Sequence, residues 1–479
     1  MTTARKFDLV VIGSGPAGEK GAAQAAYFGK SVALIEKEPV LGGACANTGT
    51  LPSKTLRESA LALSHMQARG LEQWVPDLPR PLTASTFLHR ERLIKDKERA
   101  RIARNLERHK IERITGLARF VDAQTVEVLP RDGTEPTQLT ADYFLIATGS
   151  RPNRPAWIPF VEEEVYDSDE ILQIEHVPET MLVLGSGVIA SEYACMFAAI
   201  GTQVTMLDTR DRLLGFIDGE LGAAFSNELV RMGLNLSLGD APTTCAVDAA
   251  TRICTVGTKS GKTYQAQAVL AAAGRMGNSD ALGLDKVGIA RDSRGNVPVN
   301  EHFQTSVPHI YAAGDIVGVP ALAATSMEQG RVAMCHAFKL SYKTRVSPVL
   351  PVGIYTIPEI SYVGATEEEL KKSNTDYLSG RAQMRDNARG EILGQEAGFL
   401  KLLFSPDKKI LGVHAMGPNA TEIIHVGQMA MLQGSTIDLF IEAVFNYPTL
   451  SELYKYAAYD GLGAIARRNA QAQAQVKSA

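Results

Sequence analysis

Cysteine is scarce in this chain of 479 residues, and its five cysteines follow neither a disulfide framework nor a metal-binding pattern. They stand at positions 45, 195, 245, 254 and 335, and none belongs to a CxxC pair. An odd number of scattered cysteines favours a reducing compartment. We therefore expect a cytoplasmic protein with no structural zinc site and no other bound metal.

Long apolar runs and an excess of one charge are also missing. No stretch of about 18 apolar residues is present, so we expect no transmembrane helix. The apolar run after Arg5 and Lys6 is too short for a signal peptide and is interpreted as a strand. Net charge is −4, and acidic residues interrupt the basic stretch from Arg90 to Arg119, as on a solvated helix face. Neither nucleic acid nor a membrane is expected as a partner.

The chain does contain enough apolar material for several hydrophobic cores. Its apolar fraction is 45% and its charged fraction 21%, which is typical of globular proteins. For this length we expect roughly three domains.

Two glycine-rich turns are the clearest motifs. The first, Gly13-Ser14-Gly15-Pro16-Ala17-Gly18, follows an apolar strand and precedes an alanine-rich helix, and the next strand ends at Glu36. The second, Gly185-Ser186-Gly187-Val188-Ile189-Ala190, has the same surroundings, and its next strand ends at Asp208. In both, the acidic residue stands 23 positions after the first glycine (13 to 36 and 185 to 208).

This repeated pattern predicts two dinucleotide-binding units. Small residues at 13, 15 and 18, and at 185, 187 and 190, let the backbone approach a pyrophosphate at a helix N-terminus. Glu36 and Asp208 are expected to accept hydrogen bonds from ribose hydroxyls. Two such units on one chain suggest a flavin and a nicotinamide cofactor.

A third motif, Gly42-Gly43-Ala44-Cys45-Ala46-Asn47-Thr48-Gly49-Thr50-Leu51-Pro52-Ser53-Lys54, resembles the active-site segment of the flavoprotein disulfide reductases. That family includes lipoamide dehydrogenase and glutathione reductase, in which two cysteines relay electrons from flavin to a disulfide. Here Cys45 keeps the first position and Thr50 takes the second. A hydroxyl cannot form a disulfide, so the resemblance implies the flavin without the dithiol chemistry.

Four further stretches resemble the soluble, flavin-dependent pyridine nucleotide transhydrogenase branch of this superfamily. They are Thr209–Leu214, Gly353–Ser361, Glu422–His425 and Phe445–Thr449. In the last stretch the disulfide reductases have a histidine before the proline, and it works with a glutamate as the proton relay of thiol chemistry. Glu452 is present here, but Tyr447 replaces the histidine. A phenol holds its proton at neutral pH, so the thiol and its base are missing together.

The resemblance also implies roles for single residues. Lys54 is expected beside the flavin N5 and Glu192 as its ion-pair partner, and we assign both as catalytic. Asp315, within His309–Asp315, is expected to bind the ribityl chain, and Ala321–Gln329 to be a helix whose N-terminus faces the flavin. Further cofactor contacts are expected from Lys37, Gly43, Cys45, Thr50, Ala118, Thr148, Gly149, Gly274, Arg275 and Ala323.

Two residues leave alternatives open. Cys45 could form a flavin adduct, act as a redox sensor or be a remnant that packs beside the ring, and we favour the remnant. Asp208 suits the free 2′-hydroxyl of NADH and repels the 2′-phosphate of NADPH. Arg210 and Arg212 could bind that phosphate, or could be arginines on a solvated turn. We predict use of both nucleotides with a preference for NADH. His425 is expected to be a hydrogen-bonded interface residue.

The expected fold is α/β, with two Rossmann-like dinucleotide-binding domains and a C-terminal α+β dimerisation domain. The boundaries are 1–151 and 277–345 for the FAD-binding domain, 152–276 for the NAD(P)-binding domain and 346–479 for the dimerisation domain. The last is expected to end in a helix over 450–467, and a homodimer or higher homo-oligomer is implied.

The favoured function is transfer of a hydride between NADPH/NADP⁺ and NADH/NAD⁺ through FAD, by a ping-pong mechanism at one nicotinamide pocket. The first alternative is an NAD(P)H oxidase or a quinone/diaphorase-type flavoprotein. The second is a non-catalytic flavin-binding redox sensor that uses Cys45 as its switch.

Overall fold

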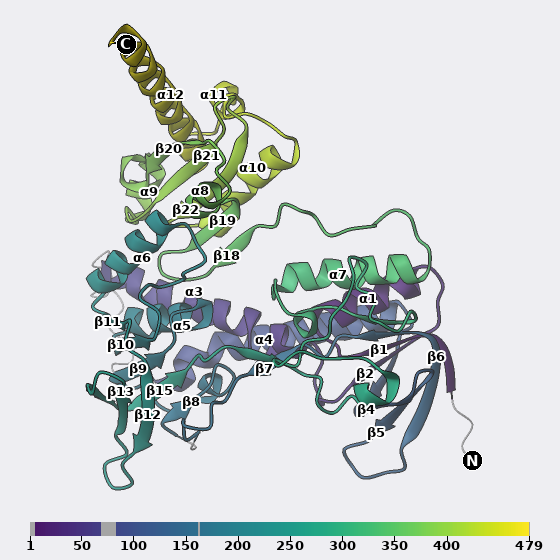
Figure 1. Ribbon diagram of the computed structural model, residues 1–479. Helices are drawn as coiled ribbons and strands as arrows, with labels where there is room; N and C mark the ends of the chain where they lie inside the picture. Colours follow the sequence, from purple (N-terminus) through teal and green to yellow (C-terminus); the bar gives the residue numbers. More distant parts are fainter. Residues whose placement is uncertain (1–4, 69–82, 161–162, 479) are drawn as a thin grey trace.

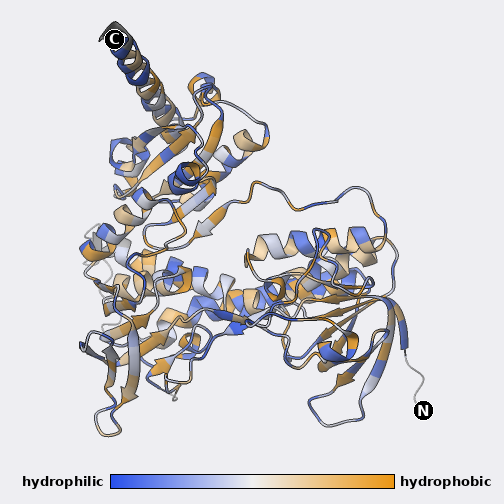
Figure 2. Cartoon of the chain, in the orientation of Figure 1, coloured by the Kyte–Doolittle hydropathy of each residue, from blue (hydrophilic) through white to orange (hydrophobic). Residues whose placement is uncertain are grey.

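The computed structural model describes residues 5–68, 83–160 and 163–478. Within this part, the chain forms a first, a second and a third body, each built around its own sheet (Figure 1). Hydrophobic residues are concentrated along the strands of these sheets (Figure 2). No helix in the described ranges is long and apolar enough to cross a membrane.

The first body is a mixed sheet centred on an apolar parallel strand. Its order is β3-β2-β1-β6-β5-β4, with β17 beside β6. Strand β1 runs parallel to β2 and β6, and its residues 9–12 are buried from both faces, as central parallel strands usually are. The strands are β1 (Arg5–Ile12), β2 (Val32–Glu36), β3 (Glu112–Thr115), β4 (Leu117–Asp122), β5 (Thr125–Leu129), β6 (Thr137–Ile146) and β17 (Ile310–Ala312).

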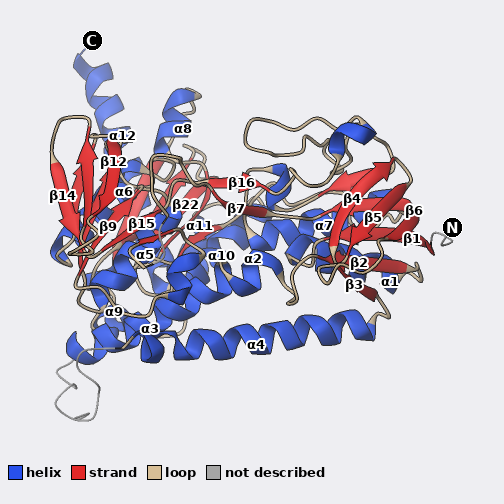
Figure 3. Ribbon diagram, turned by 90° about the horizontal axis from the view of Figure 1, so that it is seen from below, coloured by secondary structure: helices blue, strands red, loops and turns tan. Residues whose placement is uncertain are grey.

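Helices cover this first sheet and reach towards the second body. Helices α1 and α7 pack tightly on each other over one face, and α3 contacts both α4 and α5. Figure 3 shows α4 as a long helix along the lower edge of that view. The helices are α1 (Pro16–Tyr27), α2 (Gly43–Asn47), α3 (Thr50–Ala68), α4 (Ala84–Arg108) and α7 (Ala323–Ala337), with short 3₁₀ turns η3 (Leu284–Val287) and η4 (Asp315–Val317).

Helix α4 corrects one expectation from the sequence. The solvated helical face expected over 90–119 ends at Arg108, and the rest forms β3 and the start of β4. Phe87, Leu88, Ile102 and Leu106 lie on the buried side of the helix together with one charged residue, Glu91, and the other charged residues of the helix are exposed or half-buried.

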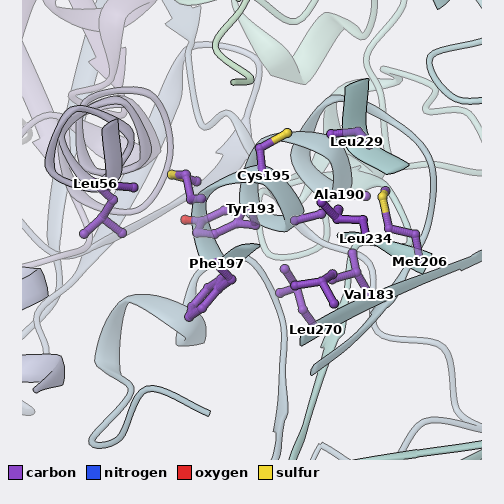
Figure 4. Packing of buried hydrophobic residues seen from close by; sticks show 14 of the residues in the cluster. Leu56, Val183, Ala190, Tyr193, Cys195, Phe197, Met206, Leu229, Leu234 and Leu270 are labelled. Atoms are coloured by element: carbon purple, nitrogen blue, oxygen red, sulfur yellow. The ribbon is translucent and has the colours of Figure 1, made fainter. Parts of the chain in front are cut away.

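The second body is a parallel sheet of order β11-β10-β9-β15-β8 with an antiparallel β12-β13-β14 unit beside it. Residues of α5 such as Tyr193, Cys195 and Phe197 pack with Val183 and Leu270 from the sheet (Figure 4). The strands are β8 (Val165–Tyr166), β9 (Thr180–Leu184), β10 (Gln203–Asp208), β11 (Asn235–Leu238), β12 (Pro242–Val247), β13 (Cys254–Thr258), β14 (Thr263–Ala266) and β15 (Ala268–Ala271). The helices are α5 (Val188–Ala199), α6 (Gly219–Arg231) and the turn η2 (Glu170–Gln173).

A two-stranded ribbon joins the first and second bodies. Strand β7 (Ser150–Pro152) carries the chain out of the first body, and β16 (Arg275–Gly277) brings it back. The two strands pair antiparallel, with Ser150 opposite Gly277. The second body is therefore an insertion in the first, held at its base by paired backbone.

The third body is an antiparallel sheet of order β18-β19-β22-β21-β20. Its strands are β18 (Val352–Ile354), β19 (Ile360–Gly364), β20 (Leu378–Gln383), β21 (Phe399–Phe404) and β22 (Ile410–Met416). Its helices are α8 (Glu367–Lys372), α9 (Ala388–Leu393), α10 (Ala420–Leu432), α11 (Asp438–Glu442) and α12 (Glu452–Ser478), with the turn η5 (Met384–Asp386).

The last helix is longer than expected. A helix over 450–467 was expected, but α12 continues to Ser478, and its end projects from the third body (Figure 1). The segment after Arg467 is rich in alanine and glutamine and contains no proline or glycine. Alanine and glutamine both favour a helix, so the helix needs no packing partner to continue.

Candidate active site

A cavity of about 940 Å³ lies where the three bodies meet. Its wall includes residues of α3, α5 and α7, together with Tyr355 and Thr421 from the third body. Most of the predicted site residues line it: Gly13, Gly15, Glu36, Lys37, Gly43, Cys45, Thr50, Lys54, Ala118, Thr148, Gly149, Glu192, Arg275, Asp315 and Ala323. The topology thus brings together residues that the sequence separates by up to 310 positions (13 to 323).

The remaining predicted residues are not among those that line this cavity. They are Gly18, Gly185, Gly187, Ala190, Asp208, Arg210, Arg212 and Gly274. Gly18 lies behind the first turn, and the next six belong to the second turn, to the end of β10 and to the loop after it. Gly274 lies where the chain returns to the first body, and its carbonyl accepts a hydrogen bond from the Asn153 backbone at 2.9 Å.

The first glycine turn is compact. Gly13 has φ +106°, and a Cβ on Gly18 would lie 1.9 Å from the Gly13 carbonyl oxygen. On Gly15 a Cβ would meet nothing within 4 Å, so this glycine faces open space. Helix α1 begins here with no side-chain cap, which leaves N–H groups of its first turn for a ligand.

Glu36 is held firmly at the end of β2. Its Oε2 accepts hydrogen bonds from the Ser14 backbone N–H at 3.0 Å and from the Ser14 hydroxyl at 2.6 Å. Its Oε1 accepts one from the backbone N–H of Glu38 at 2.9 Å. The carboxylate is therefore preorganised beside the first turn, where a ribose can donate to it.

Lys54 and Glu192 form the central ion pair of the cavity wall. Lys54 Nζ donates to Glu192 Oε1 at 2.9 Å and to Oε2 at 2.7 Å, although the two residues are 138 positions apart. The Glu192 side chain is only 4% exposed, whereas that of Lys54 is 24% exposed. A buried carboxylate thus anchors an ammonium that still faces the cavity.

Cys45 lies on α2 beside the start of α3. All five cysteines fall in the described residues and are free thiols. Burial raises the pKa of the Cys45 thiol, and a hydrogen bond with Thr50 only partly opposes this. The thiol therefore keeps its proton at neutral pH, which disfavours nucleophilic or redox chemistry at its sulfur.

Asp315 is tied to Arg275 through Ser150. The Ser150 hydroxyl donates to Asp315 Oδ2 at 2.8 Å and accepts from Arg275 Nε at 2.8 Å. Arg275 Nη1 also lies 3.5 Å from Asp169 Oδ1. Burial raises the pKa of Asp169, and the charge of Arg275 opposes this rise.

Helix α7 begins at Ala323, two residues after the start of the expected helix 321–329, and it continues to Ala337. Ala323 and Ala324 line the cavity, and the helix has no side-chain cap. Its first N–H groups and the positive end of its dipole therefore favour negative charge in the cavity.

At the end of β10, in the second dinucleotide-binding unit, Asp208 is already paired with Arg210. Its Oδ1 accepts from the backbone N–H of Arg210 at 2.7 Å, and its Oδ2 accepts from Arg210 Nη2 at 2.8 Å. Burial works to raise the pKa of Asp208, but the hydrogen bonds from Arg210 hold it below its usual range. Arg212 instead donates to the carbonyl of Gly215 at 2.6 Å.

Comparison with known proteins identifies the fold family. The model described as "Pyridine nucleotide-disulphide oxidoreductase" matches residues 7–330, and the dimerisation-domain model of that family matches residues 350–458. The chain belongs to the pyridine nucleotide-disulphide oxidoreductase family. The predicted fold class is thereby confirmed, and the second match agrees with the predicted homodimer.

Individual relatives are similar over nearly the whole chain. A protein of Mycobacterium tuberculosis (strain ATCC 25177 / H37Ra) named "Soluble pyridine nucleotide transhydrogenase" is 46% identical over 95% of this chain and 97% of its own. A protein of the same name from Yersinia enterocolitica is 41% identical over 96% of this chain and 98% of its own. The predicted resemblance to this branch is confirmed, and the chain is an oxidoreductase.

A solved structure supports the fold. The HOCl-induced flavoprotein disulfide reductase RclA from Escherichia coli, as its Cu(II) complex, superimposes with a TM-score of 0.86. It is 24% identical, with 95% of this chain and 99% of that chain covered. At this identity the likeness concerns the fold alone.

The residues present fit the cofactors of this family, FAD and NAD(P). The uncapped helix at a glycine turn suits a pyrophosphate, and the cavity is at the upper end of the size range of small-molecule sites. Lys54 and the N-terminus of α7 supply positive potential for an electron-rich ring. Helix α5 likewise begins at Gly187 with no side-chain cap, which leaves a second place for a pyrophosphate.

Tyr447, which takes the place of the relay histidine, is not among the residues that line this cavity. Tyr447 belongs to an exposed stretch of the third body and is itself 75% exposed. The sequence assigned no role to Tyr355 or Asp169, although both line the cavity. Local sequence carries little signal for either, because their partners lie on distant segments. Tyr355 does fall within the stretch 353–361 that resembles the transhydrogenase branch.

His425 also lines the cavity. Its Nδ1 lies 2.8 Å from Gln428 Oε1 on the same helix, α10. The expected hydrogen bond is therefore present, while its role at an interface stays a prediction.

Proposed function

We propose that this protein transfers a hydride between NADPH/NADP⁺ and NADH/NAD⁺ through bound FAD, without a redox disulfide. The observation that carries the proposal is the pairing of an intact Lys54–Glu192 site with a Cys45 whose partner position is Thr50. The groups that serve the flavin are kept, and the groups that would pass electrons to sulfur are gone. Relatives named soluble pyridine nucleotide transhydrogenase support the same function.

Each residue then has a limited task. FAD, when bound, supplies the centre that accepts and returns the hydride. Lys54 places a positive charge beside the ring, and Glu192 fixes the position of that charge. The first turns of α1 and α7 and the carboxylates of Glu36 and Asp315 bind and orient the cofactor. One cavity lined in part by α5 would serve both nicotinamide nucleotides, so that they would bind in turn, which is a ping-pong order.

The domain assignment follows the sheets. We propose residues 1–151 and 277–345 as the FAD-binding domain, 152–276 as the NAD(P)-binding domain and 346–479 as the dimerisation domain. The paired strands β7 and β16 support the boundaries near 151 and 276. The relatives named soluble support a cytoplasmic location.

Anaerobic rapid mixing tests the function. The protein reconstituted with FAD is reduced with NADPH, freed of excess nucleotide and mixed with NAD⁺, while flavin absorbance and NADH are followed. We expect fast recovery of the oxidised flavin spectrum with one NADH formed per flavin. A spectrum that recovers only when oxygen or a quinone is added would refute the proposal and favour an oxidase or diaphorase. Slow recovery with every acceptor would favour a redox sensor.

A further inference from the structure

A tyrosine of the third body contacts both members of the Lys54–Glu192 pair. The centroid of the Tyr355 ring lies 5.0 Å from Lys54 Nζ. The backbone N–H of Tyr355 donates to Glu192 Oε1 at 2.9 Å, across 163 positions of sequence. Tyr355 follows β18, the first strand after the long connection that leaves α7 (Figure 1).

Both contacts restrict where the ammonium can lie. Lys54 Nζ donates to the two oxygens of Glu192 and to the Ser53 hydroxyl at 3.3 Å, so its three hydrogens have acceptors. The aromatic face attracts the ammonium from another side, and this attraction grows where water is excluded. Because a lysine stem is flexible, these contacts decide the position of its charge.

Tyr355 is itself held by a chain of buried polar contacts. Its hydroxyl is hydrogen-bonded to Thr421, and Thr421 Oγ1 donates to Glu359 Oε2 at 2.8 Å. Glu359 Oε1 lies 2.9 Å from Arg57 Nη1, and Arg57 Nε donates to the carbonyl of Thr356 at 3.3 Å.

This chain of contacts forms a closed loop. Arg57 lies on α3 one turn after Lys54, so the network begins and ends beside the same ammonium. The segment 355–359 is therefore fastened to α3 at both ends. Burial raises the pKa of Tyr355, so its phenol stays neutral and supplies no base.

We propose that Tyr355 is a positioning residue, which acts through Lys54 to set where positive charge stands beside the flavin. The third body thereby contributes to the electronic properties of a cofactor bound mainly by the first. The inference rests on the proposed function only in placing the flavin ring against Lys54. It needs no second nucleotide.

The reduction potential of the bound flavin tests this role. A cation close to the ring stabilises the electron-rich reduced form, so a displaced Lys54 must lower the potential. We expect Tyr355→Leu to reduce the preference for the reduced flavin about tenfold, which is about 30 mV for a two-electron couple. Tyr355→Phe keeps the ring and should restore the wild-type potential. Tyr355→Met replaces Tyr355→Leu if the latter does not retain FAD.

Two controls separate positioning from a general structural effect. Tyr362, on β19 of the same sheet, stacks on His414, so Tyr362→Leu removes a similar ring away from Lys54. We expect it to leave the potential unchanged. In a double-mutant cycle, Tyr355→Leu should shift the potential of wild type but add nothing to Lys54→Met, because the ammonium is then absent.

Several outcomes would overturn the inference. They are an unshifted potential in both Tyr355→Leu and Tyr355→Met, equal shifts in Tyr355→Leu and Tyr362→Leu, and additive shifts in the Lys54→Met background. The potential is measured by equilibration with a reference dye, without NAD⁺. A wild-type protein that fails to reduce NAD⁺ would therefore refute the proposed function. The inference on Tyr355 would still be decided by the measured flavin potentials alone.

Discussion

Cys45 occupies the position of a reactive cysteine in a setting that does not activate it. The thiol is partly buried, burial raises its pKa, and the neighbouring position that would complete a disulfide holds Thr50. Exposure and thiolate character are what make a cysteine a redox sensor. These observations favour a packing role for Cys45 over a sensor.

Cys45→Ser should therefore preserve transfer between nucleotides. Serine is close to cysteine in size, and the proposed reaction uses no thiolate. We expect turnover within about threefold of wild type, and an unchanged rate of flavin reduction by NADPH in rapid mixing, because the flavin contacts stay filled. A drop of two orders of magnitude with FAD still bound would instead give the thiol a chemical role.

The Asp208–Arg210 pair bears on the choice between NADH and NADPH. Arg210 covers a carboxylate that would otherwise repel a 2′-phosphate, yet its side chain is 56% exposed and can turn towards a ligand. The carboxylate can accept from a free ribose hydroxyl, and the guanidinium can bind a phosphate. One pair thus offers a partner to each nucleotide.

Asp208→Asn should shift the preference towards NADPH. Removing the carboxylate removes a repulsion of roughly 1 to 4 kcal/mol at about 4 Å and frees Arg210 for the phosphate. We expect kcat/KM for NADPH relative to NADH to rise about tenfold, which corresponds to about 1.4 kcal/mol. Arg210→Ala is the matched variant and should shift the ratio the other way. An unchanged ratio in both would show that the pair does not meet the 2′ position.

At the level of elements, the close contact of α1 and α7 positions two helix N-termini at the cavity. A Cβ on Gly330 of α7 would lie 2.3 Å from the Ala17 carbonyl oxygen of α1. Backbone cannot yield as a flexible side chain does, so one added methyl group must push the helices apart. The start of α7 would move with it, away from the cofactor.

Gly330→Ala should destabilise the first body and weaken its hold on FAD. Overpacking of this kind costs typically 1–3 kcal/mol. We expect a lower thermal midpoint and faster flavin release, followed by flavin fluorescence. Gly222→Ala in α6 is the control, because its Cβ would meet nothing closer than 3.8 Å and alanine favours a helix. Equal losses in the two variants would contradict the packing argument.

Across the whole molecule, what residue patterns alone could predict was local, and the distant pair of Lys54 and Glu192 was expected only through the family resemblance. The turn at Gly13, its helix and Glu36 lie in one short stretch, so their pattern could be read directly from the sequence. Gly13 and Glu36 do line the same cavity in the structure. Tyr355 could not be assigned in this way, because it meets Glu192 only after the third body has docked on α3 and α5. The pairing of Asp208 with Arg210 depends on side-chain geometry. The full length of α12 depends on helix propensity, because no proline or glycine after Arg467 marks where the helix ends.

Docking of the third body on the second depends on a buried lysine. Lys401 of β21 is fully buried, and its Nζ lies 2.9 Å from Asp218 Oδ1, 2.9 Å from Glu220 Oε2 and 2.7 Å from Glu367 Oε1. Asp218 and Glu220 belong to the start of α6 in the second body, whereas Glu367 belongs to α8 in the third. Burial works to raise the pKa of Glu367, but the hydrogen bonds from Lys401, Lys371 and Tyr377 and the charge of Lys401 together outweigh it and lower the pKa to about 2.

This cluster should make the fold sensitive to acid. A carboxyl group with a lower pKa in the folded than in the unfolded state stabilises the fold fully above its unfolded value, here 4.5. That contribution is lost as the pH falls from 4.5 towards 2. Lys401→Met leaves Asp218 buried without its cation, whereas Glu220 keeps Arg381 and Glu367 keeps Lys371, so we expect a loss of about 3–5 kcal/mol at pH 7 that comes mainly from Asp218. Without the lysine, however, the folded carboxyls, and Asp218 above all, resist protonation less.

The gap in urea midpoint between wild type and Lys401→Met should therefore narrow as the pH falls below about 4.5, where the unfolded carboxyls begin to take up protons. Lys408→Met is the control, since Lys408 pairs with Asp438 at the surface, where both side chains are more than a third exposed. Such a pair contributes about 0–1 kcal/mol, so its variant should follow wild type at every pH. A gap for Lys401→Met that stays constant between pH 7 and pH 3 would mean that lost packing, and not the buried charges, accounts for the destabilisation.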